Sequence, residues 1–239
     1  LSADLHFGTL SVRQLWQEVV KAEAPVEDRL CFQNEFLWRD FAHHLLVDKP
    51  WLMHLPFREA FTGFPWQRDE AAWQAWVDGR TGFPVVDAAA RQLQAEGFVH
   101  NRARMVAACF LTKHLLQPYR LGEAHYLRWL VDGDWANNNM GWQWSAGCGV
   151  DAQPWFRVFN PILQGQRFDP LGHYVKRWVP ELEGVPVKWI HNPWEVPDSI
   201  RRAVHYPDPI VNHAEARRRF LEVAKSVLDK SVGPGPRQV

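Results

Sequence analysis

Apolar residues recur at helical spacing along most of this 239-residue chain, and no segment alternates apolar and polar residues for the length of a strand. Residues 12–22 are typical, because Leu15 and Val19 fall on one face after Ser11, a residue suited to begin a helix. The pattern predicts an all-α fold.

Proline and glycine divide the helical pattern into separate elements. The expected helices cover residues 12–22, 27–46, 69–77, 84–96, 98–116, 121–131, 171–178 and 211–230, with one more following residue 134. Residues 50–66 predict an irregular packed connection. We therefore expect one irregular multi-helix bundle over residues 1–230, followed by a flexible tail at 231–239, which holds two glycines and two prolines.

Composition limits the classes of function. Lys plus Arg and Asp plus Glu both number 27, so any affinity for nucleic acid must come from a local basic patch. The three cysteines are widely spaced and the histidines lack a metal-ligand pattern. We expect no metal and no disulfide framework, and a reducing, cytoplasmic setting. Signal-peptide and membrane-spanning patterns are both absent from the sequence.

Residues 132–144 concentrate polar and aromatic side chains. Two aspartates flank a glycine, three asparagines follow, and three tryptophans lie within 13 residues. Asp and Asn favour turns and helix caps, while indoles offer flat faces for stacking. The segment predicts a turn that leads into a helix and a site for a planar, polar ligand. The alternative is a helix cap followed by core tryptophans.

Trp142 and Trp144 lie about 200° apart around a helix, and we expect one to face the interior while the other lines a cleft.

A second candidate lies on the helix expected at residues 27–46. Phe32, Glu35, Trp38 and Arg39 share one face, since they are three or four residues apart. A carboxylate, an indole and a guanidinium on one face suit a stacked, hydrogen-bonded ligand such as a nucleobase. The alternative is a surface ion pair between Glu35 and Arg39 beside a partly buried Trp38.

A third candidate is His-Asn-Arg-Ala-Arg-Met at residues 100–105. Asn101 and Met105 lie one turn apart, whereas Arg102 and Arg104 point to different sides. One arginine suits a phosphate and the other suits a buried acid such as Asp132. The alternative is a solvated basic start of a helix.

Five sequence blocks follow one another in a characteristic order. They are Asn-Glu-Phe-Leu-Trp-Arg-Asp-Phe at 34–41, Thr-Gly-Phe-Pro-Val-Val-Asp-Ala-Ala at 81–89, the block at 100–105, the segment 132–144 with its Trp-Gln-Trp end, and Arg-Val-Phe-Asn-Pro at 157–161. In this order they resemble the DNA photolyase/cryptochrome family. The resemblance covers residues 1 to about 197 and implies the helical FAD-binding half, without the family's N-terminal antenna domain and its pigment.

The resemblance also implies roles for individual residues toward reduced FAD. It places around the cofactor Ser2, Phe32, Glu35, Arg39, Asn101, Arg104, Asp132, Gly133, Asp134 and Asn138. Among these, Asn138 would face the flavin N5 edge and favour the reduced flavin, and Arg104 would pair with Asp132.

For DNA and the lesion, the resemblance implies Glu35, Trp38, Arg39, Asn101, Arg102, Met105, Trp144 and Gln164. Glu35 and Asn138 would act in catalysis. Trp142 would begin an electron-transfer chain that passes through Tyr119 to Trp66. Most relatives carry tryptophan at the middle position, and tyrosine is harder to oxidise without losing its proton.

His-Asn-Arg-x-Arg-Met together with Trp-Gln-Trp is most similar to class I cyclobutane pyrimidine dimer photolyases. The function this implies is light-driven repair of DNA by a monomer, with damaged single- or double-stranded DNA as the partner. The alternatives are a cryptochrome-type photoreceptor without repair activity and a helical binding module without cofactor.

Overall fold

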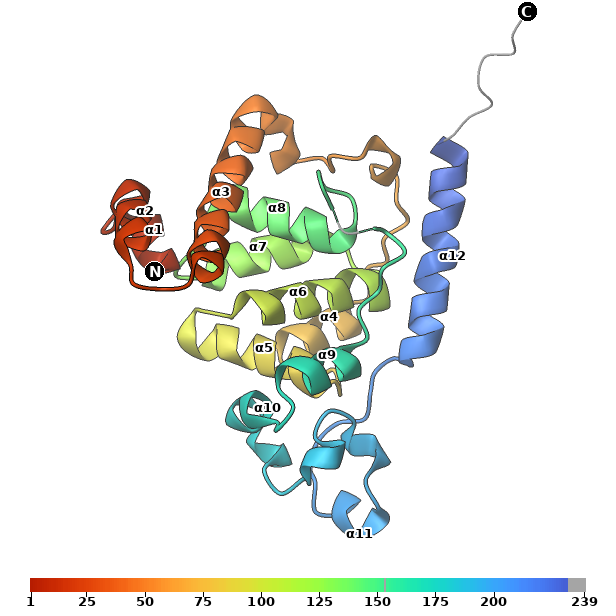
Figure 1. The fold of residues 1–239 in the computed structure, drawn as a ribbon. Helices are drawn as coiled ribbons and strands as arrows, with labels where there is room; N and C mark the ends of the chain where they lie inside the picture. Colours follow the sequence, from red (N-terminus) through yellow and green to blue (C-terminus); the bar gives the residue numbers. More distant parts are fainter. Residues whose placement is uncertain (153, 232–239) are drawn as a thin grey trace, which may run out of the picture.

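The structure is a computed structural model that describes residues 1–152 and 154–231, and these ranges contain helices and no strand (Figure 1). The α-helices are α1 (Ser2–Phe7), α2 (Val12–Lys21), α3 (Val26–Asp48), α4 (Glu70–Val77), α5 (Pro84–Glu96), α6 (Asn101–Cys109), α7 (Tyr119–Trp129), α8 (Trp135–Ala146), α9 (Pro161–Phe168), α10 (His173–Trp178), α11 (Asp198–Arg201) and α12 (His213–Ser231). Single turns of 3₁₀-helix lie at Pro50–Met53, Glu59–Phe61, Pro180–Leu182, Val187–Trp189 and Pro193–Glu195. The all-α prediction is confirmed.

Two apolar clusters hold the bundle together. The larger joins α4–α8 with α12 around side chains such as Trp76, Phe110 and Phe220. The smaller lies under α10 and the 3₁₀ turns after it, around Val175 and Ile190. Helices α1 and α2 bury no residue and lie beside α3 at one edge of the molecule (Figure 1).

Most expected helices form close to their predicted ranges. Helix α5 has the predicted bounds, because Pro84 opens it and Gly97 closes it in a left-handed conformation with φ 63°. The helix expected at 98–116 differs. The His100 side chain accepts a hydrogen bond from the Arg102 N–H at 3.1 Å, so the helix begins at Asn101. After Cys109 the chain widens into a π-turn at Phe110–His114.

The π-turn is buried along its whole length. Its Lys113 donates from Nζ to the carbonyl oxygen of Arg157 at 2.9 Å and lies over the ring of Phe220. Burial lowers the pKa of Lys113 to about 8. The turn thus attaches the 157 segment and α12 to the centre of the bundle.

A buried carboxylate, Asp87, connects α5 to a segment far along the chain. It accepts hydrogen bonds from the backbone N–H groups of Thr81 and Gly82 at 2.8 and 3.1 Å, and from the Thr81 hydroxyl at 2.6 Å. The Tyr206 hydroxyl donates to it as well. Burial raises the pKa of Asp87 above its usual range. These bonds join the loop before α5 to the segment before α12.

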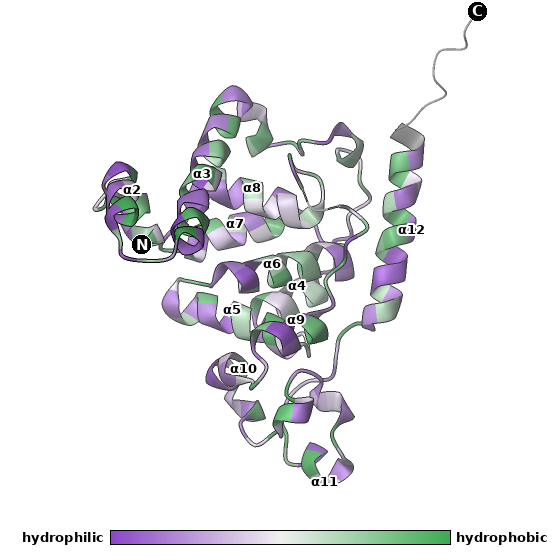
Figure 2. Cartoon of the chain, viewed as in Figure 1, coloured by the Kyte–Doolittle hydropathy of each residue, from purple (hydrophilic) through white to green (hydrophobic). Residues whose placement is uncertain are grey.

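Helix α12 lies along the bundle with buried Ala216, Phe220 and Ala224 on one face, and Figure 2 shows apolar and polar residues alternating around it. Ser231, the first residue of the predicted tail, ends this helix. The rest of that tail, residues 232–239, lies outside the described residues. Across the described ranges, no helix is long and apolar enough to cross a membrane.

Candidate functional site

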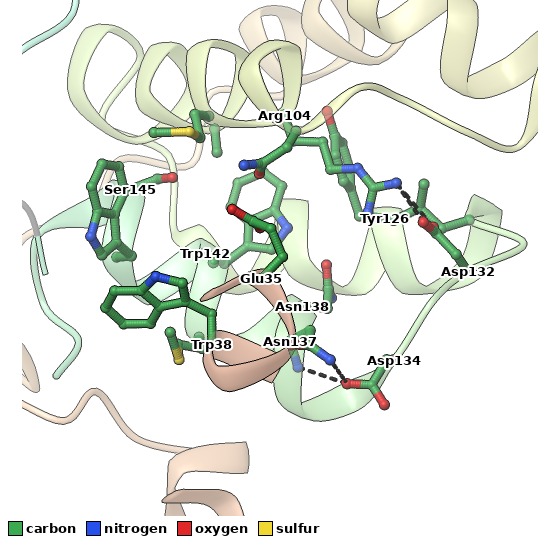
Figure 3. Close-up of a pocket in the computed structure, with 17 residues that line it drawn as sticks. Glu35, Trp38, Arg104, Tyr126, Asp132, Asp134, Asn137, Asn138, Trp142 and Ser145 are labelled. Carbon is green, nitrogen blue, oxygen red and sulfur yellow. Dashed lines mark hydrogen bonds and ion pairs between the residues drawn. The ribbon is translucent and has the colours of Figure 1, made fainter. Parts of the chain in front are cut away.

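A cavity of about 420 Å³ opens between α3, α6, α7 and α8 (Figure 3). Its walls consist of Glu35, Trp38, Asn101, Arg104, Met105, Ala108, Tyr126, Leu130, Asp132, Asp134, Asn137, Asn138, Met140, Gly141, Trp142, Trp144 and Ser145. Its size is that of a small-molecule site. The three candidate segments of the sequence therefore meet in one place.

The N-terminus of α8 is fixed by Asp134, as the Asp-Gly-Asp turn predicts. Its carboxylate accepts hydrogen bonds from the Asn137 backbone N–H at 2.8 Å and from the Asn137 side-chain amide at 2.7 Å. His43 on α3 contacts the other carboxylate oxygen at 3.1 Å. Burial opposes ionisation of Asp134, but the Asn137 and His43 contacts prevail and hold its pKa below the usual range.

Sequence reasoning missed His43, which links α3 to the start of α8. Its Nδ1 lies 2.8 Å from the carbonyl oxygen of Arg39, one turn earlier on the same helix. The available signal was its position four residues after Arg39 on the face that carries Glu35.

Arg104 and Asp132 form the expected pair. Nη2 of Arg104 donates to both carboxylate oxygens of Asp132, at 3.0 and 2.9 Å, and its Nε donates to the Val99 carbonyl at 2.6 Å. Across the described residues no ion pair joins Glu35 to Arg39, the alternative that the helical spacing left open. Glu35 and Trp38 instead reach into the cavity from α3 (Figure 3).

The three consecutive asparagines have separate tasks. Asn137 completes the cap of α8, while Asn139 donates to the Leu52 carbonyl at 3.0 Å and to the Glu123 carboxylate at 2.7 Å. Asn138 donates its amide N–H to the Glu123 backbone carbonyl at 2.9 Å. This bond leaves the Asn138 oxygen as the group available to the cavity, so the site offers a hydrogen-bond acceptor there.

Trp142 lies in the larger apolar cluster and Trp144 lies at the cavity wall, which agrees with the predicted division between interior and cleft, and Trp142 lines the cavity as well. Trp142 is buried and Trp144 is half-buried. Both indoles reach the cavity because it follows a wide arc of α8, from Asn137 and Asn138 through Met140 and Gly141 to Ser145. Trp142 also packs so close to α7 that a Cβ on Gly122 would lie 2.0 Å from its ring.

The structure does not bring every candidate to the cavity wall. Those outside it are Ser2, Phe32, Arg39, Trp66, Arg102, Gly133, Tyr119 and Gln164. Their roles toward cofactor and DNA stay predictions. Wall residues outside the candidate segments are Ala108, Tyr126, Leu130 and Ser145, whereas Asn137, Met140 and Gly141 lie within the candidate segment 132–144.

A basic patch adjoins Asn101 at the cavity wall. Arg102 lies 4.4 Å from the centroid of the Phe168 ring, and Arg167 lies 5.2 Å from the same ring. Burial, then the charges of Arg167 and Arg157, lower the pKa of Arg102. Because the charges of Arg157 and Arg167 both act on Arg102, these arginines form the kind of local positive field that a chain of zero net charge needs to attract a polyanion.

In the described ranges, no group of three or more His, Cys, Asp or Glu side chains is arranged to hold a metal ion. The cavity instead presents carboxylates, amides and indole faces. Such a helical domain, with a mixed polar and aromatic cavity at its centre, is a cofactor-binding domain.

Residues 32–226 match the family model described as the FAD binding domain of DNA photolyase, and the chain belongs to that family. It is 45% identical over 225 residues to a deoxyribodipyrimidine photo-lyase of Escherichia coli, a match that covers 92% of this chain and 48% of that protein. The chain thus spans about half the length of the curated relatives it matches.

Two solved structures have the same fold. A class III photolyase from Agrobacterium tumefaciens superimposes with a TM-score of 0.92 at 44% identity, covering 96% of this chain and 49% of that one. A Synechocystis cryptochrome gives a TM-score of 0.87 at 33% identity, covering 93% and 48%.

The residues in the cavity fit FAD, the cofactor of this family. An isoalloxazine ring has flat faces and an edge of alternating donors and acceptors. Trp142 provides an indole beside the cavity, and the Asn138 oxygen provides an acceptor held by the Glu123 bond. Asp132 and Asp134 provide further acceptors on the side of the cavity away from Trp38 (Figure 3).

Proposed function

We propose that this chain is the catalytic half of an enzyme that uses light to split cyclobutane pyrimidine dimers in DNA. Reduced FAD bound in the cavity would supply, on excitation, the electron that opens the ring of the dimer. The observation that carries the proposal is the single cavity that joins the Asn138 acceptor to Glu35, Trp38, Met105 and Trp144.

The lesion end of the cavity suits a flipped-out dimer. Trp38 and Trp144 provide surfaces on which its bases stack, and Glu35 accepts a hydrogen bond from a base edge. Asn101 adds an amide at the same wall. Flipping costs least at a damaged, poorly paired site, which gives selectivity for the dimer.

The basic patch positions the DNA strand. Arg102, Arg157 and Arg167 suit phosphates on either side of the flipped dimer, with Gln164 on α9 nearby. Phosphate contacts of this kind act on any sequence, as a repair enzyme requires. We further propose that residues 1–230 act as one catalytic domain of a monomer in the cytoplasm, on single- or double-stranded DNA.

Within the family we assign the chain to the enzymes for cyclobutane dimers, and the class I assignment stays a prediction. The Asn138 acceptor supports repair, because it suits an N5–H on reduced flavin. The family also contains the photoreceptor that resembles this fold, which keeps signalling as the second candidate.

The test is repair of a thymine-dimer oligonucleotide by the full-length, flavin-loaded protein, with and without blue light. We expect restored thymines only in the light. A flavin-loaded protein without light-dependent repair would favour the photoreceptor. A correctly folded protein that lacks flavin colour would favour the cofactor-free binding module.

A further inference from the structure

Gly141 leaves a stretch of bare backbone in the wall of the cavity. The residue lines the cavity and is exposed, and a Cβ built on it would meet no atom within 4 Å. A side chain at this position would therefore project into open space at the cavity. The other wall residues of α8 all carry side chains, and they are Asn137, Asn138, Met140, Trp142, Trp144 and Ser145.

The fold itself does not require glycine at position 141. Its φ lies outside the left-handed region, unlike that of Gly147 at the end of the same helix. Close packing does not exclude a side chain either, whereas at Gly122 a Cβ would lie 2.0 Å from the Trp142 ring. Glycine is also less favourable than alanine inside a helix. The remaining use of glycine is the close approach of backbone to a bound group.

Gly141 lies between the two ends of the cavity. It follows Asn138, the acceptor assigned to the flavin, by three residues, and it precedes Trp144, at the lesion end, by three. Residues at this spacing share one face of a helix, and six residues advance about 9 Å along its axis. Figure 3 shows Asn138 and Ser145 on opposite sides of Trp142. The bare backbone thus lies where a bound flavin and a bound dimer would meet.

Another wall of the cavity comes from α3, which contributes Glu35 and Trp38 (Figure 3). Trp38 is 46% exposed, so a face of its indole is free for stacking. A dimer stacked there meets no side chain at position 141, and its rings can approach the backbone of α8. The stacking surface on α3 and the bare backbone on α8 therefore serve the same ligand.

We propose that Gly141 is a positioning residue that lets the dimer approach the flavin closely enough for efficient electron transfer. The inference deepens the proposed function and rests on it. Electron transfer between two bound rings falls exponentially with their separation. A side chain at position 141 would occupy space between the rings and keep the dimer away from the flavin, while the residues that hold the flavin stay unchanged.

The experiment compares Gly141→Ala and Gly141→Leu in the full-length, flavin-loaded protein after chemical reduction of the flavin. Gly184→Ala is the matched control, because its Cβ also meets nothing within 4 Å and the residue lies outside the cavity wall. Flavin content and melting temperature show whether each variant folds, and Gly141→Ala keeps the test decisive if Gly141→Leu is unstable.

Two quantities are measured with a saturating dimer-containing oligonucleotide. One is the repair yield per absorbed photon, and the other is the fluorescence lifetime of the reduced flavin. The lifetime becomes shorter when an electron passes to the dimer, so it reports the separation of the two rings. A purely structural role of Gly141 would leave this lifetime unchanged in folded, flavin-loaded protein.

We expect all variants to hold flavin. Misplacement of reacting groups by about 1 Å can cost about 100-fold in rate. Gly141→Ala should therefore repair severalfold fewer dimers per photon, with a longer flavin lifetime, and Gly141→Leu should lose more. Gly184→Ala should match the parent.

Parent values of yield and lifetime in folded Gly141→Ala would overturn the inference. So would a loss that is explained by missing flavin or by weaker dimer binding alone. These outcomes leave the proposed function intact, because the parent still repairs. Absence of light-dependent repair by the parent would instead reject the proposed function, and the inference with it.

Discussion

The side-chain amide of Asn138 on α8 donates to the backbone carbonyl of Glu123 on α7 at 2.9 Å. This one bond joins the two helices and also sets the orientation of the Asn138 amide toward the cavity. Because a carbonyl oxygen can accept a hydrogen bond but cannot donate one, the amide N–H of Asn138 must point to α7. Its oxygen must therefore remain available to the cofactor.

Asn138→Asp should lower the midpoint potential of the bound flavin. The carboxylate cannot donate to Glu123, so two acceptors oppose each other at a cost of about 1–3 kcal/mol. The added negative charge also disfavours electron-rich flavin. Spectroelectrochemistry would measure a shift of tens of millivolts, since about 30 mV corresponds to 1.4 kcal/mol for two electrons. Asn138→Ala separates loss of the amide from gain of charge, and an unchanged potential in Asn138→Asp would contradict the assigned orientation.

Glu35→Ala should reduce the repair yield per absorbed photon while leaving flavin bound. A hydrogen bond to a charged group contributes about 1.5–3 kcal/mol, so we expect roughly a tenfold loss or more. Glu35→Gln retains a hydrogen-bonding group without the charge, and its repair yield should lie between those of Glu35→Ala and the parent. The measurement is repair under counted photons with pre-reduced protein. Equal yield in Glu35→Ala and parent would remove Glu35 from the mechanism.

Trp38→Ala should weaken binding of the lesion. Loss of one stacking surface costs about 1–3 kcal/mol per base, which a gel-shift titration with a dimer-containing oligonucleotide would detect. Trp135→Ala is the control, because Trp135 is an exposed indole on α8 that does not line the cavity. The assignment fails if both variants bind the dimer as tightly as the parent.

Asp134→Asn should destabilise the protein at neutral pH and not in acid. The folded state lowers the pKa of Asp134 below the ordinary 3.8, so its charge stabilises the fold above pH 3.8. That contribution is lost as pH falls through the lower, folded-state pKa. Asparagine can still cap the helix, so urea unfolding at pH 7 should show a deficit of about 0.3–1 kcal/mol, the usual contribution of a negative charge at a helix N-terminus. His43→Ala should show part of this deficit, and a deficit that persists unchanged in strong acid would contradict the account.

Gly122→Ala should destabilise the bundle, because its new Cβ would lie 2.0 Å from the Trp142 ring. Overpacking of this kind costs about 1–3 kcal/mol. Gly141→Ala is the control, since its Cβ would meet nothing within 4 Å and alanine favours a helix by about 0.5–1 kcal/mol. Melting temperatures of the two variants should move in opposite directions. Equal stability of Gly122→Ala and parent would mean that Trp142 has room to move.

Local signals explain the parts of the fold that the sequence predicts well. Pro84, Gly97 and Asp134 act through the backbone beside them, so helix ends near these residues follow from neighbouring residues alone. The π-turn at Phe110–His114 depends on burial against α12 and the 157 segment, which no local pattern reports. Helix α9 is not among the predicted helices, although Asn160 caps it through its side chain and Pro161 occupies its first position, which are local start signals.

In the functional site too, local sequence signals predict some features, and other features depend on the packing of distant segments. Spacing on one helix predicts that Glu35 and Trp38 share a face, and the Arg104–Asp132 pair follows from charge and motif. Helical spacing could not place Trp142 and Trp144 in one cavity, because the shape of a cavity depends on the helices around it. His43 and Asp134 lie 91 residues apart in the sequence, so their contact also depends on how the helices pack.

The Asp87 carboxylate has a consequence for synthesis of the protein. Its Tyr206 partner is 119 residues further along the chain. In a nascent chain that does not yet include Tyr206, the Asp87 carboxylate lacks one of its hydrogen bonds. The finished fold buries this carboxylate completely. Contacts over such separations form late, since the intervening chain must first be ordered. Helix α5 therefore reaches its final environment only after Tyr206 has left the ribosome.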